Sequence, residues 1–89
     1  MPNADFMNTI LLVEDEPHVA DLIKQSLEEE GYQVIHAFDG IEGMNILKKQ
    51  TVHLLILDIL LPKMNGLEVC RQIRSEGYLD LPILILTAL

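Results

Sequence analysis

The sequence predicts an α/β fold, in which a parallel β-sheet carries helices on both of its faces. Short apolar runs of strand length alternate with longer stretches in which apolar residues recur every three or four positions. The run at residues 54–57 is apolar throughout, as expected of a strand that is covered on both faces. A regular alternation of strand and helix is typical of parallel sheets with right-handed crossovers.

The first strand and the first helix are predicted at residues 9–13 and 17–30. Pro17 suits the first helical turn, where a missing backbone N–H removes no hydrogen bond. Gly31 is expected to end the helix in a left-handed conformation, with Tyr32 packing back against the last turn. This stretch therefore has both a start signal and a stop signal for one amphipathic helix.

The second strand is predicted at residues 33–37, and a second helix follows it. Asp39 is the expected N-cap, because Glu42 lies three positions further on, in the spacing of a capping box. Lys48 and Lys49 stand near the end of this helix, where positive charge suits the helix dipole.

The last helix and strand repeat the same signals. Asn65 is the predicted N-cap, with Glu68 three positions further on. Residues 76–78 (EGY) end this helix in the way that residues 30–32 (EGY) end the first. The fourth strand is predicted at residues 81–86.

Length and composition indicate one domain, and because the first predicted strand begins at residue 9, residues 1–8 are expected to be an N-terminal extension to a domain at residues 9–89. The 89 residues suffice for a single small domain. A formal charge of −8 leaves no basic patch for phosphates, so this segment is not expected to bind nucleic acid directly. Residues 1–8 do not resemble a secretory signal, no apolar run is long enough to span a bilayer, and Cys70 is the single cysteine. We therefore expect a soluble, cytoplasmic domain without membrane contact.

Four polar residues close otherwise apolar strands, and they form the candidate site. Glu14 and Asp15 follow the first strand, Asp58 follows the third, and Thr87 follows the fourth. A parallel sheet brings these strand ends to one edge, where ligands bind in such folds. Three carboxylates in one cleft call for a cation, and an oxygen-only donor set suits Mg²⁺. Asp58, the central acid, is the candidate nucleophile toward phosphorus, and Thr87 could supply a hydroxyl to a phosphoryl oxygen.

Three ordered blocks closely resemble the receiver domain of two-component response regulators. The blocks are residues 10–16 (ILLVEDE), 55–66 (LILDILLPKMNG) and 82–88 (PILILTA). Shorter matches lie between them, and the pattern is most similar to regulators that carry a winged-helix DNA-binding output domain. The resemblance covers residues 9–89, and several blocks at the expected spacing are more specific than one short motif.

The resemblance implies a role for each candidate residue. Asp58 matches the phosphoacceptor, and Glu14 and Asp15 match the acidic pair that binds Mg²⁺ together with Asp58. Leu60 matches the residue whose backbone carbonyl also binds the metal, and Thr87 matches the switch hydroxyl. The implied function is a phosphorylation-controlled signalling switch, not an enzyme, whose partner is a sensor histidine kinase. DNA would be contacted only through an output domain outside this segment.

The resemblance also implies a flavodoxin-like, doubly wound sheet of strand order 2-1-3-4-5. In that pattern Pro62 and Gly66 shape the loop after the acceptor, and Ala88 is the small residue beside the switch hydroxyl. The fourth helix, the fifth strand with its phosphoryl-contacting lysine, and the fifth helix have no match within the 89 residues. The fold predicted for this segment is therefore a sheet of order 2-1-3-4 that ends at the fourth strand.

A sheet that ends at the fourth strand would leave residues 81–86 as an apolar edge. Edges of this kind offer unpaired backbone groups to another chain, and uncovered apolar faces favour association. We therefore expect that the 89-residue chain associates with itself through this strand, that it exchanges elements between copies, or that it is part of a longer protein. Sedimentation of the 89-residue chain would test this expectation.

Two other functions fit parts of the pattern. A pseudo-receiver would have the fold and act as a protein-interaction module without phosphorylation, but the intact Asp58, Glu14, Asp15 and Thr87 count against it. A phosphohydrolase that forms an aspartyl phosphate usually has a second aspartate two residues after the nucleophile, and that position is Leu60.

The remaining histidines and the cysteine have ordinary interpretations. No pair of histidines has the spacing of a zinc site. His18 lies near the acids but is expected at the surface of the first helical turn, and His36 and His53 are expected to be ordinary strand and loop residues. Cys70 is expected to pack in the core.

Overall fold

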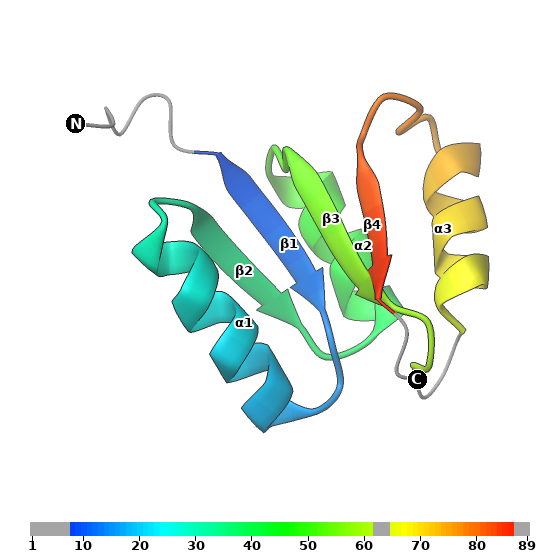
Figure 1. The fold of residues 1–89 in the computed structure, drawn as a ribbon. Helices are drawn as coiled ribbons and strands as arrows, with labels where there is room; N and C mark the ends of the chain where they lie inside the picture. Colours follow the sequence, from blue (N-terminus) through cyan, green and yellow to red (C-terminus); the bar gives the residue numbers. More distant parts are fainter. Residues whose placement is uncertain (1–7, 62–64, 87–89) are drawn as a thin grey trace.

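The computed structural model describes residues 8–61 and 65–86, in which strands and helices alternate as predicted (Figure 1). The elements are β1 (Thr9–Val13), α1 (Pro17–Glu29), β2 (Gln33–Ala37), α2 (Gly40–Lys49), β3 (Leu54–Asp58), α3 (Gly66–Ser75) and β4 (Ile83–Leu86). Within these residues, none of the helices has the length and apolar character needed to cross a membrane.

The strands form one parallel sheet in the order β2-β1-β3-β4, which confirms the predicted topology. Val13, the last residue of β1, lies opposite Ala37 of β2 and Leu57 of β3. Asp58 lies opposite Leu86 at the end of β4. This register places the carboxyl ends of the two central strands, β1 and β3, side by side.

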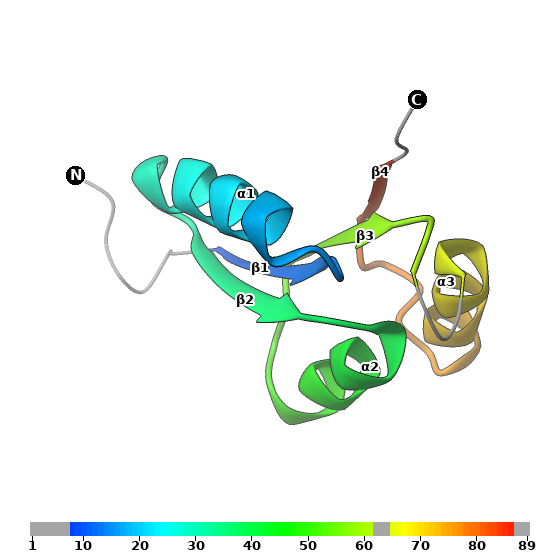
Figure 2. The same cartoon turned by 90° about the horizontal axis from the view of Figure 1, so that it is seen from below.

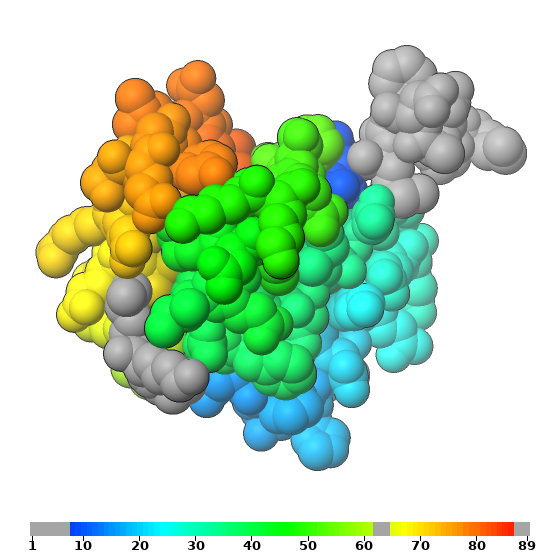
Figure 3. All heavy atoms as spheres, turned by 180° about the vertical axis from the view of Figure 1, so that it is seen from behind, coloured from blue at the N-terminus to red at the C-terminus, as the bar shows by residue number. Residues whose placement is uncertain are grey.

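Helices lie on both faces of the sheet, with α1 on one face and α2 and α3 on the other (Figure 2). Figure 3 shows α2 and α3 together covering their face from behind. Alternate strand residues point to the two faces: Leu11, Val13, Leu55 and Leu57 pack toward α2 and α3, and Ile10, Leu12 and Ile56 toward α1. Burial of one such aliphatic side chain is worth about 1.5–3 kcal/mol, so these two clusters hold the sheet between its helices.

The helices begin where the sequence predicts. Pro17 is the first residue of α1. The Asp39 carboxylate accepts the Glu42 N–H at 2.8 Å at the start of α2, and the Asn65 side chain accepts the Leu67 N–H at 2.7 Å at the start of α3. Each cap satisfies a backbone donor that the first helical turn leaves without a partner.

Two glycines end helices in the predicted left-handed conformation. Gly31 has a φ of 97° and Gly77 a φ of 101°. After α1, the Gly31 N–H bonds to the Glu28 carbonyl at 3.0 Å and the Tyr32 N–H to the Leu27 carbonyl at 3.2 Å. This pair of bonds is the Schellman motif, and α3 ends in the same way.

The prediction that the fourth strand begins at residue 81 was wrong, because β4 begins at Ile83. Leu81 is a buried loop residue, and its carbonyl accepts a hydrogen bond from Arg74 Nη1 at 2.6 Å. Pro82 has no N–H to donate to a neighbouring strand, although its carbonyl accepts the Leu55 N–H at 3.0 Å. Two smaller boundary differences are the end of α1 at residue 29 and the inclusion of Asp58 in β3.

One part of the α1 face has no helix over it within the described residues. Figure 2 shows α1 over β1 and β2, whereas β4 lies beyond its reach. Leu84 of β4 is paired with Ile56 of β3, whose side chain faces α1, so the Leu84 side chain lies on the same face. The exposed fraction of Leu84 is 51%. Among the described strands β4 lies at the edge of the sheet, and its Leu84 is exposed on this uncovered part of the face.

Candidate functional site

Three carboxylates meet at the carboxyl ends of the central strands. Glu14 and Asp15 directly follow β1, and Asp58 is the last residue of β3. One carboxylate oxygen from each lies within 4.8 Å of the others. The three acids differ in burial, since Glu14 is buried, Asp58 is half-buried and Asp15 is exposed. The parallel pairing of β1 with β3 creates this cluster from residues more than forty positions apart in the sequence.

Glu14 is the electrostatically unusual member of the cluster. Only 5% of its surface is exposed, and its Oε2 accepts the Glu16 N–H at 3.1 Å. Burial raises the pKa of the Glu14 carboxyl above its ordinary value of 4.5, and the negative charge of Asp58 raises it further, although the bond from Glu16 opposes them. A nearby cation would therefore stabilise the charged form of this carboxylate.

The raised pKa predicts how the metal-free protein responds to pH. The folded state binds the Glu14 proton more tightly than the unfolded chain does, so the charged carboxylate destabilises the fold at neutral pH. This penalty decreases as the pH falls through the raised pKa and is absent below the unfolded value of 4.5. We expect wild-type protein to gain stability relative to Glu14→Gln as the pH falls from neutrality through the raised pKa to 4.5, measured by urea unfolding with a chelator.

Glu14→Gln isolates this effect, because glutamine stays neutral and its oxygen can still accept the Glu16 N–H. Glu16 has a lowered pKa, caused mainly by the bond that its carboxylate accepts from the His18 N–H, but it is present in both proteins and cancels from the difference. Unfolding free energies that run parallel for the two proteins across this pH range would contradict the prediction.

Asp58 is held by the loop that follows it. Its Oδ1 accepts the Leu60 N–H at 3.1 Å, which orients the carboxylate at the end of β3. The next residue, Ile59, accepts the Gly66 N–H at 2.9 Å, so the first residue of α3 lies directly against the chain after Asp58. The acceptor candidate is therefore positioned by both β3 and the start of α3.

The structure places several of the site residues predicted from the sequence at the carboxyl ends of β1 and β3. It brings Glu14, Asp15 and Asp58 together and places Leu60 beside them. Thr87 lies outside the described residues, as do Pro62 and Ala88. His18 is exposed at the start of α1, as predicted, and its Nδ1 also lies 3.1 Å from a carboxylate oxygen of Glu16.

Sequence reasoning missed one residue next to the acids. His36 of β2 was expected to be an ordinary strand residue, but its Nε2 lies 2.7 Å from the backbone carbonyl oxygen of Glu14. The signal that could have found it is the register of β1 and β2. Pairing Leu12 with His36 places the imidazole one step before the strand end that carries the acids.

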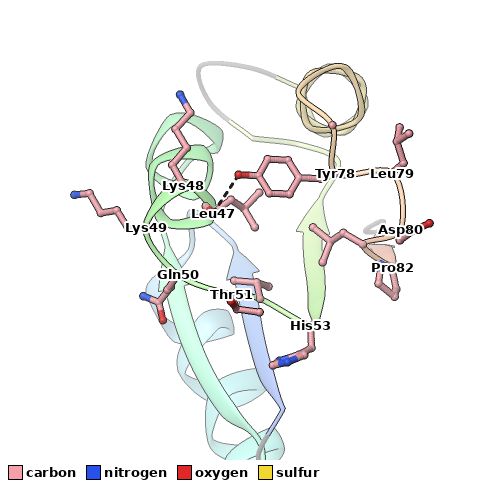
Figure 4. Close-up of a pocket in the computed structure, with 13 residues that line it drawn as sticks. Leu47, Lys48, Lys49, Gln50, Thr51, His53, Tyr78, Leu79, Asp80 and Pro82 are labelled. Atoms are coloured by element: carbon pink, nitrogen blue, oxygen red, sulfur yellow. Dashed lines mark hydrogen bonds between the residues drawn. The ribbon is translucent and has the colours of Figure 1, made fainter.

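A hollow of about 690 Å³ lies at the opposite edge of the sheet, away from the acids (Figure 4). It is bounded by the end of α2, the loop after it and the loop before β4, and the Tyr78 hydroxyl bonds across it to the Leu47 carbonyl at 3.2 Å. Its charged or titratable lining residues include Lys48, Lys49, His53 and Asp80, and in Figure 4 the two lysine side chains extend away from it. The titratable cluster, and not this hollow, is the better candidate site.

The donor set of the cluster fits a hard divalent cation. All three groups are carboxylates, which are the ligands that Mg²⁺ prefers, and the cluster contains no sulfur or imidazole donor. Oxygens within 4.8 Å of one another can share one hydrated cation through one or two direct bonds and bound water. The buried charge of Glu14 would be neutralised by such an ion.

An open parallel sheet of order 2-1-3-4 with acids at the ends of its central strands defines a flavodoxin-like α/β domain with its site at the strand ends. The family model for the response regulator receiver domain matches residues 10–89. This chain therefore belongs to the response regulator receiver domain family, as the sequence resemblance predicted.

Known relatives agree with this assignment. Response regulator MprA of Mycobacterium avium (strain 104) is 46% identical over 79 residues, which are 89% of this chain and 34% of MprA. The chain thus spans about a third of this relative. Response regulator protein TrrA from Thermotoga maritima, solved in complex with Mg(2+)-BeF, has a TM-score of 0.87 and 41% identity, covering 93% of this chain and 71% of TrrA. TrrA in complex with histidine kinase ThkA matches with a TM-score of 0.85 and 41% identity, covering 92% of this chain and 70% of that chain.

Proposed function

We propose that this chain is a phosphorylation switch of a two-component system, in which Asp58 accepts a phosphoryl group from a histidine kinase. The observation that carries the proposal is the convergence of three carboxylates on the end of β3, where the following loop orients Asp58. Membership of the receiver family supports it, as do the TrrA structures with Mg(2+)-BeF and with a histidine kinase. Residues 9–89 are the proposed receiver domain, and residues 1–8 an extension.

Each residue of the site has a distinct proposed role. A carboxylate oxygen of Asp58 forms the new bond to phosphorus as the bond from phosphorus to the kinase histidine breaks. Glu14, Asp15, Asp58 and the Leu60 backbone carbonyl would hold Mg²⁺. When bound, the metal neutralises negative charge on the transferring group. The Thr87 hydroxyl, which follows β4 in the sequence, would bond a phosphoryl oxygen and couple phosphorylation to the output surface.

Intact-mass measurement tests the proposal directly. The 89-residue chain is incubated with Mg²⁺ and a small-molecule phosphodonor, and a parallel sample contains an excess of chelator. We expect the addition of one phosphoryl group per chain only where the metal is present, because three uncompensated carboxylates repel an incoming phosphoryl group.

Absence of the adduct would show that Glu14, Asp15 and Asp58 do not suffice for the chemistry. Repeating the incubation with a longer polypeptide that includes the segments present in the relatives then decides between two explanations. Phosphorylation of the longer chain would support the proposed switch. A longer chain that is not phosphorylated would favour a pseudo-receiver that acts only by binding a protein. An adduct that survives chelation would refute the metal-dependent site.

We also propose that the 89-residue chain associates with itself through β4. Among the described strands, β4 pairs only with β3, and its Leu84 is half-exposed on a face that no described helix covers. An exposed, apolar strand edge can pair with a second copy. Sedimentation velocity over micromolar concentrations is expected to show a concentration-dependent shift toward dimers, and Leu84→Lys is expected to reduce it. A single monomeric species at every concentration would contradict this expectation.

A further inference from the structure

His36 makes a hydrogen bond to the backbone between two members of the acid cluster. Its Nε2 lies 2.7 Å from the carbonyl oxygen of Glu14. A carbonyl oxygen can only accept, so Nε2 carries the proton and donates it in this bond. The carbonyl belongs to the peptide unit that joins Glu14 to Asp15. The hydrogen bond from the imidazole therefore restrains the orientation of the backbone that carries both acids.

Strand β2 holds both backbone polar groups of Glu14. The Glu14 N–H donates to the Ala37 carbonyl at 3.0 Å, and the Glu14 carbonyl accepts from His36. The last paired residues of β1 and β2 are Val13 and Ala37, so Glu14 lies one position past the regular ladder. The hydrogen bond from the His36 side chain thus continues the contact between β1 and β2 by one residue, to the point where the acidic loop begins.

The imidazole is itself held in place. The side chain is half-buried, and its ring lies 4.2 Å from the ring of Phe38, centroid to centroid, at an interplanar angle of 49°. A ring that packs on one side and bonds at its tip has few alternative rotamers. The donor of the bond to Glu14 therefore has little freedom to move. A donor held in this way can fix the orientation of the peptide that accepts its bond.

We propose that His36 is a positioning residue for the divalent-cation site, because it fixes the Glu14–Asp15 peptide and with it the separation of the two carboxylates. This inference rests on the proposed function for the identity of the ligand. Residues that orient metal ligands from behind typically change metal affinity by about 10–100-fold when they are replaced. His36 touches neither the phosphoryl group nor the metal in this proposal.

Substitutions at position 36 separate the hydrogen bond from the packing. His36→Gln keeps an N–H donor close to the place of Nε2, whereas His36→Leu fills a similar volume without a donor, and His36→Met is a second donor-free variant should the leucine not fold. His53→Leu is the matched control. It removes another histidine bond to the sheet backbone, the one that Nδ1 accepts from the Thr9 N–H at 3.0 Å, in a residue remote from the acids.

The first measurement is Mg²⁺ affinity by isothermal titration calorimetry at one fixed pH, with folding checked by circular dichroism. We expect His36→Leu to weaken binding by about tenfold or more, His36→Gln to recover most of that loss, and His53→Leu to bind as wild type does. Equal affinity of His36→Leu and wild type would overturn the proposal, as would a glutamine variant as weak as the leucine variant.

The second measurement needs no metal and distinguishes failure of this inference from failure of the proposed function. The Asp15 amide belongs to the same peptide unit as the Glu14 carbonyl, so its ¹⁵N chemical shift reports on the bond from His36. In the metal-free protein we expect the Asp15 resonance to move in His36→Leu and to return toward the wild-type position in His36→Gln. If wild type binds no Mg²⁺, the metal site is refuted, and this pattern of shifts alone decides whether His36 positions the acids. An Asp15 resonance that is unchanged in His36→Leu would overturn the inference.

Discussion

Replacing Asp58 with asparagine is expected to abolish phosphoryl transfer to the chain while leaving the fold intact. Asparagine has nearly the same shape, and its side-chain oxygen can still accept the Leu60 N–H that Asp58 accepts at 3.1 Å. The amide is not a nucleophile toward phosphorus, and the cluster loses one of its three charges. Among the described residues, the cluster consists of Glu14, Asp15 and Asp58. Asp58→Asn therefore leaves Glu14 and Asp15 as its remaining carboxylates.

The measurement is intact mass after incubation with Mg²⁺ and the phosphodonor, as for wild type. Asp80→Asn is the matched control, since it makes the same chemical change at an exposed position in the loop before β4. We expect one phosphoryl group on Asp80→Asn and none on Asp58→Asn, with equal circular dichroism spectra. A Mg²⁺-dependent adduct on Asp58→Asn would show that another residue accepts the phosphoryl group and would refute the proposed acceptor.

Gly66→Ala is expected to have the second-largest effect, because it disturbs both the fold and the site. A Cβ atom at Gly66 would lie 2.5 Å from the carbonyl oxygen of Asp58 and 2.7 Å from Cα of Ile59. Both are backbone atoms, so the clash cannot be relieved by rotation of a side chain. Alanine normally stabilises a helix by about 1 kcal/mol relative to glycine. Here we expect the opposite sign, a loss of about 1–3 kcal/mol, because the start of α3 must move away from β3.

Because the added Cβ also presses on the Asp58 carbonyl, we expect Asp58 to shift relative to Glu14 and Asp15. A misplacement of about 1 Å at a reacting group can cost roughly a hundredfold in rate, so the rate of Mg²⁺-dependent adduct formation is expected to fall by a similar factor. Urea unfolding and the time course of the mass shift provide the two measurements.

Gly77→Ala distinguishes this site effect from a general loss of stability. Gly77 has a φ of 101°, and an added Cβ would meet no atom within 4 Å. Alanine there is strained by its backbone conformation, at a cost of about 1–2 kcal/mol, but it lies at the far end of α3 from the acids. We expect Gly77→Ala to lose stability and keep its phosphorylation rate. An equal loss of rate in both variants would mean that Gly66 acts only through stability.

Much of the fold could be predicted because its determinants are local. Asp39 and Asn65 cap helices through bonds that span two or three residues, and Gly31 and Gly77 stop helices because glycine tolerates a positive φ. Apolar runs mark the strands, because helices cover both faces of the central strands β1 and β3. The start of β4 could not be read in the same way. Leu81 is buried in a loop, and an apolar residue adjoining a strand looks the same in the sequence whether it pairs or only packs.

The sequence by itself determined the α/β class of this protein, the order of its elements and the presence of acids at the strand ends, because these depend on periodicity, capping and the parallel topology. Only the tertiary structure decided how the site is supported. The burial that raises the Glu14 pKa and the 2.7 Å bond from His36 bring together residues far apart in the sequence, and the contact of Gly66 with the chain after Asp58 joins two separate elements, β3 and α3. Such contacts depend on strand register and on the seating of α3 against the sheet, and these follow from packing of the whole domain.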